Sequence, residues 1–347
     1  MAPSRASTFW GVSSSVAFIL ILAAASSTAV SALLHPQKSS SSSSSASTTN
    51  EGGSKKGDGA TCKEESFPNM MKQHFASIGS TQDEARRIVT DTLMDDQTTT
   101  NMVCVTATEQ TNGRGTSGRA WMGARGNTFV TIAIPQQRWM DHKHLPLTLL
   151  PLTVGILVAE RVQALMDACL LERSNNNQPM SSSSLSSSRP KVTLKWPNDV
   201  LVNEDKIAGI LIESTTTGWF LIGIGVNLGY APPVPTDGPN HGRTSTSLSN
   251  HCTPPSTQET TTWEDMAHQV GVDLAKNLNA FLDNPPMLSN AIVNEWKQWA
   301  DFNMELVMRD TPKRERVKLV DMLPDGRIQV VGLDDGTSRV LVADYFI

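Results

Sequence analysis

Residues 192–213 place stronger limits on the fold of this chain than any other stretch, because they are typical of a β-hairpin. Apolar and polar residues alternate over 192–196, and apolar residues fill 200–202 and 207–212. Turn-forming residues at 203–205 separate the two halves. We therefore expect a strand, a tight turn and a second strand, and a sheet at the centre of the fold.

Two lysines, Lys195 and Lys206, lie at opposite ends of apolar segments in this hairpin, and Pro197 and Asn198 interrupt the strand beside the first. A partly buried lysine costs free energy unless it has an anionic partner, which favours lysines that face an anion. Lysines on edge strands also block aggregation. Residue type alone leaves both interpretations open.

The fixed positions of the hairpin are Lys195–Asp199, which reads Lys-Trp-Pro-Asn-Asp, then Lys206, Gly209, Leu211 and Glu213. This pattern resembles the Lys-Trp-Pro-Asn-Asp … Lys-x-x-Gly-x-Leu-x-Glu signature of the biotin–protein ligases. The resemblance implies an α+β fold, a mixed sheet flanked by helices like the class II synthetase catalytic domains, with a small C-terminal β-barrel.

A glycine-rich segment at 110–121 carries the spacing Gly113-x-Gly115-x-x-Gly118. In a dinucleotide-binding fold this motif must open a helix, but strand-like residues 127–135 follow, and the Gly-Lys-Ser/Thr of a phosphate loop is absent. Both nucleotide motifs are therefore excluded. Glycine amides and forked guanidinium groups still suit the loop to an anion. Its arginines are Arg114, Arg119 and Arg125.

The same segment resembles the Gly-Arg-Gly-Arg-x-Gly-Arg-x-Trp loop that folds over biotinyl-adenylate in the biotin–protein ligases. The matching residues are Gln110, Gly113, Arg114, Gly115, Gly118, Arg119 and Trp121. Thr116 stands where the family usually has a second arginine, and Gly123-Ala124 replaces its Ser-Pro. Fewer cations over the adenylate predict looser retention of this intermediate and non-specific labelling of nearby lysines.

Two more motifs have a structural and a functional interpretation. Ser80 and Thr81 begin an expected helix, in which Thr81 would cap and Glu84 would reach back, but Gly-Ser-Thr also resembles the element that binds the biotin ureido ring. Residues 223–228 form an expected strand whose glycines allow tight packing, and they resemble the Gly-x-Gly-x-Asn strand that lines the adenylate pocket. Asn227 needs a polar partner there.

The resemblance implies a two-step, ATP-dependent reaction that forms biotinyl-5′-AMP and then biotinylates a lysine of a biotin carboxyl carrier protein or domain, such as that of acetyl-CoA carboxylase. Magnesium would accompany ATP, with no metal ligand assigned. The implied roles are catalysis by Lys195, Arg114 and Arg119, biotin binding by Ser80, Thr81, Gln110, Gly113, Arg114, Lys195 and Gly209, and adenylate or ATP binding by Gly115, Gly118, Arg119, Trp121, Trp196, Asn198, Asp199, Lys206 and Asn227. A lipoate or octanoate transferase of the same fold and a non-catalytic biotinyl-AMP binder are the alternatives.

The first 32 residues have the plan of a signal peptide: Arg5, an apolar run at 16–25, and a small-x-small pattern ending at Ala32. Residues 33–66 are rich in serine and glycine and cannot build a core, which predicts a disordered linker or transit region. Together they predict entry into a plastid through the secretory route, where ATP and a carrier protein exist. A cytoplasmic location is the alternative.

Residues 67–300 are expected to form the catalytic domain, with a buried helix at 145–171, a low-complexity insert at 174–189 and a mobile loop at 231–262. Four short strands within 301–347 predict the small barrel.

Composition excludes several other classes of protein. The formal net charge of -5 argues against a general nucleic-acid binder, and we expect no DNA-binding domain before the catalytic part. The apolar run near the N-terminus is too short for a comfortable membrane span, so we expect no stable insertion of the mature chain. The four cysteines are widely spaced and predict neither a zinc site nor a disulfide framework.

Overall fold

The computed structural model describes residues 63–67, 70–92, 102–175, 190–235, 243–252, 262–308 and 315–342, which all belong to one compact unit, Asp58–Ile347. The predicted signal segment, most of the predicted linker and residues 176–189 of the predicted insert lie outside the described residues.

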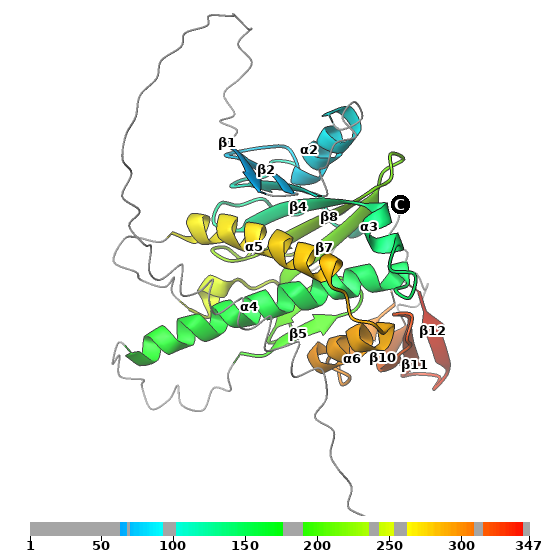
Figure 1. Cartoon of the computed structure of the whole chain (residues 1–347). Coiled ribbons are helices and arrows are strands. Elements are labelled where there is room, and N and C mark those ends of the chain that lie inside the picture. Colours follow the sequence, from blue (N-terminus) through cyan, green and yellow to red (C-terminus); the bar gives the residue numbers. More distant parts are fainter. Residues whose placement is uncertain are drawn as a thin grey trace, which may run out of the picture. The chain divides into compact units, whose positions relative to one another are not determined.

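The larger part of the described chain is built on an eight-stranded sheet with the order β1-β2-β3-β4-β8-β7-β6-β5 (Figure 1). β2 and β3 pair in parallel and the other neighbours are antiparallel, so the expected mixed sheet is confirmed. The strands are β1 Lys63–Phe67, β2 Met70–Phe75, β3 Val103–Ala107, β4 Thr128–Pro135, β5 Val192–Lys195, β6 Asp199–Val202, β7 Asp205–Ser214 and β8 Trp219–Val226. The sheet thus begins at Lys63, within the segment predicted to be linker.

The predicted hairpin contains three strands rather than two, because residues 196–198 form a second turn. This turn reverses the chain so that Lys195 of β5 pairs directly with Asp199 of β6. The two ends of the Lys-Trp-Pro-Asn-Asp motif therefore face each other across neighbouring strands.

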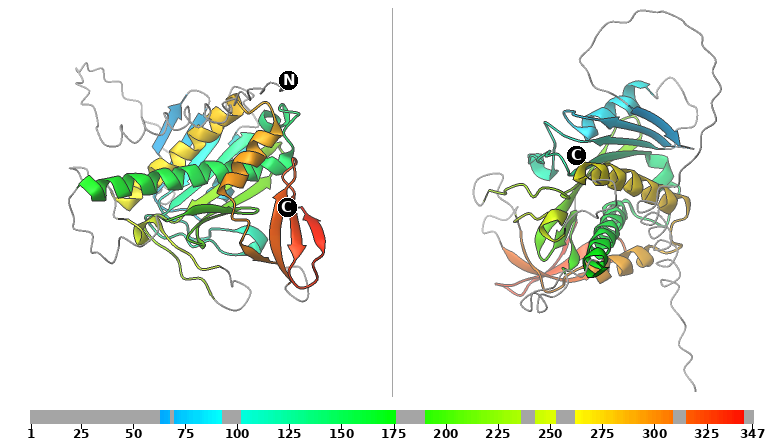
Figure 2. Two further views of the ribbon diagram at one scale, coloured as in Figure 1. Left: turned by 90° about the horizontal axis from the view of Figure 1, so that it is seen from below. Right: turned by 90° about the vertical axis from the view of Figure 1, so that its left-hand side faces the viewer.

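Helices cover both faces of the sheet, as Figures 1 and 2 show. Cys104 and Ile132 belong to the core that contains residues of α4 and α5, whereas Val105 and Ala133 pack with α2 on the opposite face. Among the described helices, this alternation places α2 and the turn that continues it on the face that carries the site described below. The helices are α2 Thr81–Arg87, continued by a π-helical turn Ile88–Thr92, then α3 Gln136–Met140, α4 Leu150–Asn175, α5 Trp263–Asp283 and α6 Ser289–Trp299.

The long helix α4 carries Pro151 in its first turn, as expected. Among the described helices, only the stretch Leu147–Cys169 is long and apolar enough to cross a membrane. Of its most apolar 18 residues, 83% are buried inside the protein. This burial confirms the prediction of a core helix on the sheet.

The start of α2 differs from the prediction, because Ser80 is the N-cap and Thr81 is the first helical residue. The backbone of Ser80 is extended and its Oγ accepts a hydrogen bond from the Gln82 amide at 3.2 Å. The Thr81 hydroxyl donates to Gln110 Oε1 instead, at 3.1 Å. The predicted capping box between Thr81 and Glu84 is therefore wrong.

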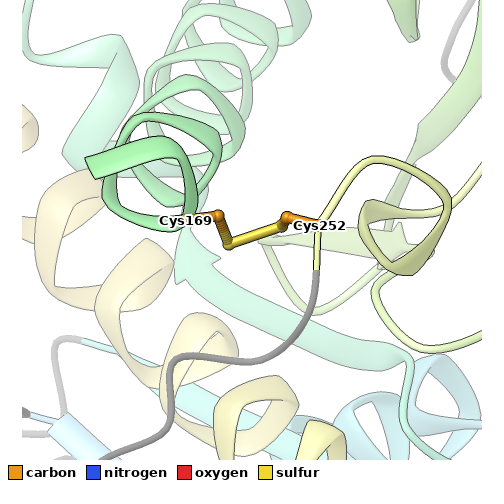
Figure 3. The surroundings of a disulfide bond; sticks show 2 residues. All are labelled: Cys169 and Cys252. Atoms are coloured by element: carbon orange, nitrogen blue, oxygen red, sulfur yellow. A yellow bond between two sulfur atoms is a disulfide. The ribbon is translucent and has the colours of Figure 1, made fainter. Parts of the chain in front are cut away.

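A disulfide joins Cys169 of α4 to Cys252, which follows the short 3-10 helix Leu248–Asn250 (Figure 3). The expectation of no disulfide is thus wrong. The two cysteines are 83 residues apart in sequence and only folding brings their Cα atoms to 5.8 Å, so spacing could not reveal the pair. Cys104 is buried and unpaired.

The C-terminal part forms a second, four-stranded antiparallel sheet with the order β12-β11-β10-β9. Its strands are β9 Glu305–Val307, β10 Arg316–Met322, β11 Ile328–Gly332 and β12 Ser338–Leu341. The four expected strands are confirmed, and closure of this sheet into a barrel stays a prediction.

Candidate active site

Lys195 and Lys206 share the carboxylate of Asp199. Lys195 Nζ lies 3.3 Å from Asp199 Oδ2, and Lys206 Nζ lies 2.5 Å from Oδ1. The side chains are only 24%, 20% and 13% exposed for Lys195, Lys206 and Asp199, so neither lysine presents an exposed charge that would block aggregation, although Lys195 belongs to the edge strand β5. Both lysines therefore face an anion supplied by the protein itself.

The ionisation of this cluster depends on burial and on the ion pairs. Burial lowers the pKa of Lys195 from its ordinary value, while the nearby Asp199 opposes this shift. Burial raises the pKa of Asp199, but Lys206 and Lys195 outweigh it and lower this pKa to about 2. With one carboxylate for two ammonium groups, the charged cluster retains a net positive charge that can attract an anion.

Two asparagines hold the backbone around the cluster. Asn198 Nδ2 donates to the Ile210 carbonyl at 2.9 Å, and the Ile210 amide donates back to the Asn198 carbonyl at 3.0 Å. Asn227 Nδ2 donates to the Thr246 carbonyl at 3.1 Å, and its Oδ1 accepts from Asn127 at 3.3 Å. The expected polar partners of Asn227 are therefore confirmed, and a role of either amide toward adenylate or magnesium stays a prediction.

The glycine-rich segment forms a small hairpin rather than the start of a helix. The Trp121 amide donates to the Gly113 carbonyl at 2.8 Å, and the Gly115 amide donates to the Arg119 carbonyl at 2.7 Å. Gly118 has a φ of 70°, a conformation that a side chain would strain. The exclusion of a dinucleotide motif is therefore confirmed.

Each of the two main loop arginines has a partner. Arg114 Nη1 binds Asp83 of α2 at 2.6 and 2.7 Å, and Arg114 Nη2 lies 3.6 Å from Glu213 of β7. Arg119 donates from Nη2 to Thr116 Oγ1 at 2.8 Å and from Nε to the Thr116 carbonyl at 3.1 Å. Thr116, where the family usually has an arginine, thus orients the next arginine of the loop.

Trp121 lies over two glycines that pair across the sheet, Gly209 of β7 and Gly225 of β8. A Cβ on Gly209 would lie 2.8 Å from the indole ring, and one on Gly225 would overlap it. Lys206 Nζ lies 5.4 Å from the ring centroid, within range of a cation–π interaction. The indole Nε1 is buried and makes no hydrogen bond in the part of the chain that the structure describes.

A chain of buried polar side chains starts at the first turn of α2. Gln110 Oε1 accepts from the Thr81 amide at 2.8 Å and from its hydroxyl at 3.1 Å. The Thr131 hydroxyl lies 2.9 Å from Thr81 Oγ1 and 3.1 Å from Gln82 Oε1, and Gln82 Nε2 donates to the Leu221 carbonyl at 3.1 Å. Sequence reasoning missed Gln82 and Thr131, although a threonine inside the apolar strand β4 is a signal of a polar pocket.

These groups line one cavity of about 830 Å³. Every predicted site residue lines it except Gly113, Gly118 and Trp196. The first two shape the loop, and the predicted adenylate-binding role of Trp196 stays a prediction. Its indole Nε1 donates to the carbonyl of Gly326 in the C-terminal part, at 3.3 Å.

Three segments outside the motifs also line the cavity: Arg243–Ser245, Pro232–Pro235, and the strand β9 of the C-terminal sheet. The first two lie in the stretch predicted to be a mobile loop. The structure holds Arg243–Ser245 in place, because the Lys206 amide donates to the Thr244 carbonyl at 2.8 Å and the Thr246 amide donates to the Lys206 carbonyl at 2.9 Å. Its Ser- and Thr-rich composition concealed this pairing.

The mixed sheet with helices on both faces is the same arrangement as in the catalytic fold of a solved biotin protein ligase. Residues 75–229 match the biotin/lipoate A/B protein ligase family. This match includes the glycine-rich loop and the Lys-Trp-Pro-Asn-Asp motif, and the resemblance drawn from the motifs is confirmed.

Individual relatives extend the comparison. The biotin--[acetyl-CoA-carboxylase] ligase of Paracoccus denitrificans is 34% identical over 137 residues, which cover 37% of this chain and 45% of that protein. The enzyme of the same name from Mycobacterium tuberculosis is 30% identical over 136 residues, covering 38% of this chain and 41% of that protein. The matched region spans less than half the length of these curated relatives.

Among solved structures, the biotin protein ligase of Leishmania major in complex with biotin is 25% identical to this chain, with a TM-score of 0.50. The superposition covers 80% of this chain and 100% of that chain. The likeness therefore extends beyond the matched family region.

Proposed function

We propose that this protein is an ATP-dependent biotin ligase, which forms biotinyl-5′-AMP and transfers biotin to a lysine of a carrier protein. The observation that carries the proposal is that the Lys195–Asp199–Lys206 cluster and the Thr81–Gln110 polar pair line the same cavity. The first supplies positive charge for phosphate, and the second supplies hydrogen bonds for a polar ring. The names of the relatives support the same substrate.

In the first step, a biotin carboxylate oxygen attacks the α-phosphorus of ATP, the bond between the α-phosphorus and its bridging oxygen breaks, and pyrophosphate leaves. Negative charge grows around the α-phosphate as this happens. Cations that are already in place stabilise that charge without reorganisation. We assign this role mainly to Lys195 and Arg114, with Arg119 and Lys206 assisting.

In the second step, the neutral amine of a carrier lysine attacks the acyl carbon of the mixed anhydride. The bond from that carbon to the AMP oxygen breaks, AMP leaves with the electron pair, and the nitrogen loses a proton to give the amide. The acceptor is a biotin carboxyl carrier protein or domain, as the names of the curated relatives suggest.

Biotin would lie with its ureido ring at the polar end of the cavity, near Ser80, Thr81 and Gln110. Ser80 Oγ accepts from a backbone amide, so its proton is available for a ligand carbonyl. Trp121 provides an apolar surface beside this end. Such polar groups favour biotin over lipoate or octanoate, because an aliphatic chain would leave them unpaired.

Magnesium would arrive with the nucleotide. No three His, Cys, Asp or Glu side chains among the described residues form a metal-binding group, and Asp199 already serves two lysines. We therefore assign no protein ligand to the metal and no step to it.

The test is biotin-dependent exchange of pyrophosphate into ATP, with the Lys195→Ala variant beside it. Lys191→Ala is the matched control, because Lys191 is exposed and does not line the cavity. We expect exchange that requires biotin, is lost in Lys195→Ala and persists in the control. If lipoate or octanoate supports exchange and biotin does not, the protein has a sister activity. If none of these acids supports exchange, the protein is a non-catalytic binder.

We further propose that residues 1–66 direct the protein to a plastid through the secretory route. The support is their composition: a basic start, a short apolar run and a hydroxyl-rich segment. A fusion of residues 1–70 to a fluorescent protein tests this, and cytosolic fluorescence would refute it.

A further inference from the structure

Arg243 is a cation of the cavity that no recognised motif contains. Its Nη1 donates to the backbone carbonyl of Glu204 at 3.0 Å, which directs the side chain along the turn between β6 and β7. Burial lowers the pKa of Lys195 and Asp199 opposes this shift, while the positive charges of Lys206 and, to a smaller extent, Arg243 lower the same pKa. Arg243 is therefore electrostatically coupled to the lysine cluster.

The segment that carries Arg243 is attached to the same cluster. Ser245 forms a parallel bridge with Lys206, and the Thr244 hydroxyl donates to Asp205 at the start of β7. Further along, the disulfide of Cys252 ties the segment to α4. The position of Arg243 is thus set by the strand that presents Lys206 to the cavity.

The charges of the cavity differ in how far the protein neutralises them. Arg114 contacts two carboxylates, Asp83 and Glu213, and the two lysines share Asp199. Arg243 has no carboxylate partner among the described residues, and its hydrogen bond to the Glu204 carbonyl uses one of five guanidinium donors. Its charge and most of its donors are therefore available to a ligand.

A nucleoside triphosphate brings more negative charge than the lysine cluster can balance, because Asp199 cancels one of its two positive charges. We propose that Arg243 binds the β- and γ-phosphates, the part of ATP that leaves as pyrophosphate, while Lys195 and Arg114 act at the α-phosphate. The identity of the anion rests on the proposed function. A forked guanidinium suits this task because it can grip two phosphate oxygens at once.

The variants that test the assignment are Arg243→Gln, which removes the charge, and Arg243→Lys, which keeps the charge but not the fork. Arg87→Gln is the matched control, because Arg87 is exposed and pairs with Glu84 outside the cavity. In the exchange assay we expect Arg243→Gln to raise the KM for both ATP and pyrophosphate by roughly 10- to 100-fold, as for the loss of a charged hydrogen bond. The KM for biotin should not change, and Arg243→Lys should restore part of the loss.

Calorimetric titration of the full chain with inorganic pyrophosphate, ATP and AMP separates the possible failures. Weaker binding of pyrophosphate and ATP by Arg243→Gln, with AMP unaffected, supports the assignment even if the wild-type chain shows no exchange and the proposed function fails. Weaker binding of AMP alone, or no change in any titration, overturns the assignment. Circular dichroism that matches the wild type verifies that each variant is folded.

Discussion

Replacing Asp199 with asparagine would test the charge balance of the site, because it keeps the shape of the side chain and removes the charge that two lysines share. Lys195 Nζ and Lys206 Nζ lie 3.3 and 2.5 Å from the two carboxylate oxygens. The variant leaves two ammonium groups in a largely buried place without their anion. We expect a lower free energy of unfolding, and a Lys195 that loses its charge at a lower pH.

The size of the stability loss follows from the pKa of Asp199, which falls from 3.8 to about 2 in the folded protein despite the opposing effect of burial. This difference corresponds to about 2 kcal/mol in the free energy of unfolding. Because the folded pKa is depressed, the stabilisation is fully present above about pH 4 and is lost as the pH falls through about 2. The asparagine variant should therefore be less stable by about 2 kcal/mol at neutral pH.

Urea denaturation at pH 7 measures this difference, with Asp325→Asn as the control. Asp325 also pairs with an arginine, but the two side chains are 39% and 43% exposed, so its loss should cost less than about 1 kcal/mol. Equal unfolding midpoints for Asp199→Asn and the wild type would refute the shared-carboxylate argument. So would a loss that Asp325→Asn reproduces.

The same variant should narrow the pH range of adenylation. Burial lowers the pKa of Lys195 and Asp199 opposes that shift, so removing Asp199 lowers this pKa further. Charged Lys195 then disappears at a lower pH, and the alkaline limb of the exchange rate should move toward neutrality. An unchanged alkaline limb would mean that the charge of Lys195 does not govern the first step.

Three further predictions concern the frame around the site. Burial and Glu295 raise the pKa of Glu160 from 4.5 to about 7, so the free energy of unfolding should fall by up to about 3 kcal/mol between pH 4.5 and 7, and Glu160→Gln should flatten that slope in urea titrations. Replacing Cys252 with serine opens a link between residues 83 apart and should lower the free energy of unfolding by about 4 kcal/mol, a loss that dithiothreitol reproduces in the wild type. Gly225→Ala should displace Trp121 and reduce biotin-dependent exchange, whereas Gly155→Ala in α4, whose new methyl group would meet Leu194 at an ordinary contact distance of 3.5 Å, away from the cavity, should leave exchange unchanged.

Much of the fold could be predicted because apolar residues recur with a single period, that of a strand or that of a helix, within each segment. The strand-like residues 127–135 became β4, and turns that contain Gly326 and Gly336 separate the last three strands of the C-terminal sheet. The start of α2 was misplaced by one residue because Ser80 and Thr81 are both good capping residues. Only the extended backbone of Ser80 decides between them.

Thr131 had a local signal in the apolar strand β4, but Arg243 has none. Arg243 lies between a proline-rich stretch and a run of serine and threonine, and its place in the cavity depends on backbone pairing of its segment with Lys206, which lies far away in sequence. The disulfide between Cys169 and Cys252 depends in the same way on how α4 packs. Contacts between distant segments are set by the whole fold, so composition could not report them.

The two tryptophans of the motifs show why residue type alone does not assign a role. Trp121 and Trp196 are equally suited by chemistry to be an apolar wall. Trp121 reaches the cavity because Gly209 and Gly225 leave room for its ring on the face of the sheet beside α2. Trp196 lies in the turn after β5, where its indole donates to Gly326 and joins the hairpin to the C-terminal part. The same turn brings Asp199 opposite Lys195, so Trp196 supports the lysine cluster from outside the cavity.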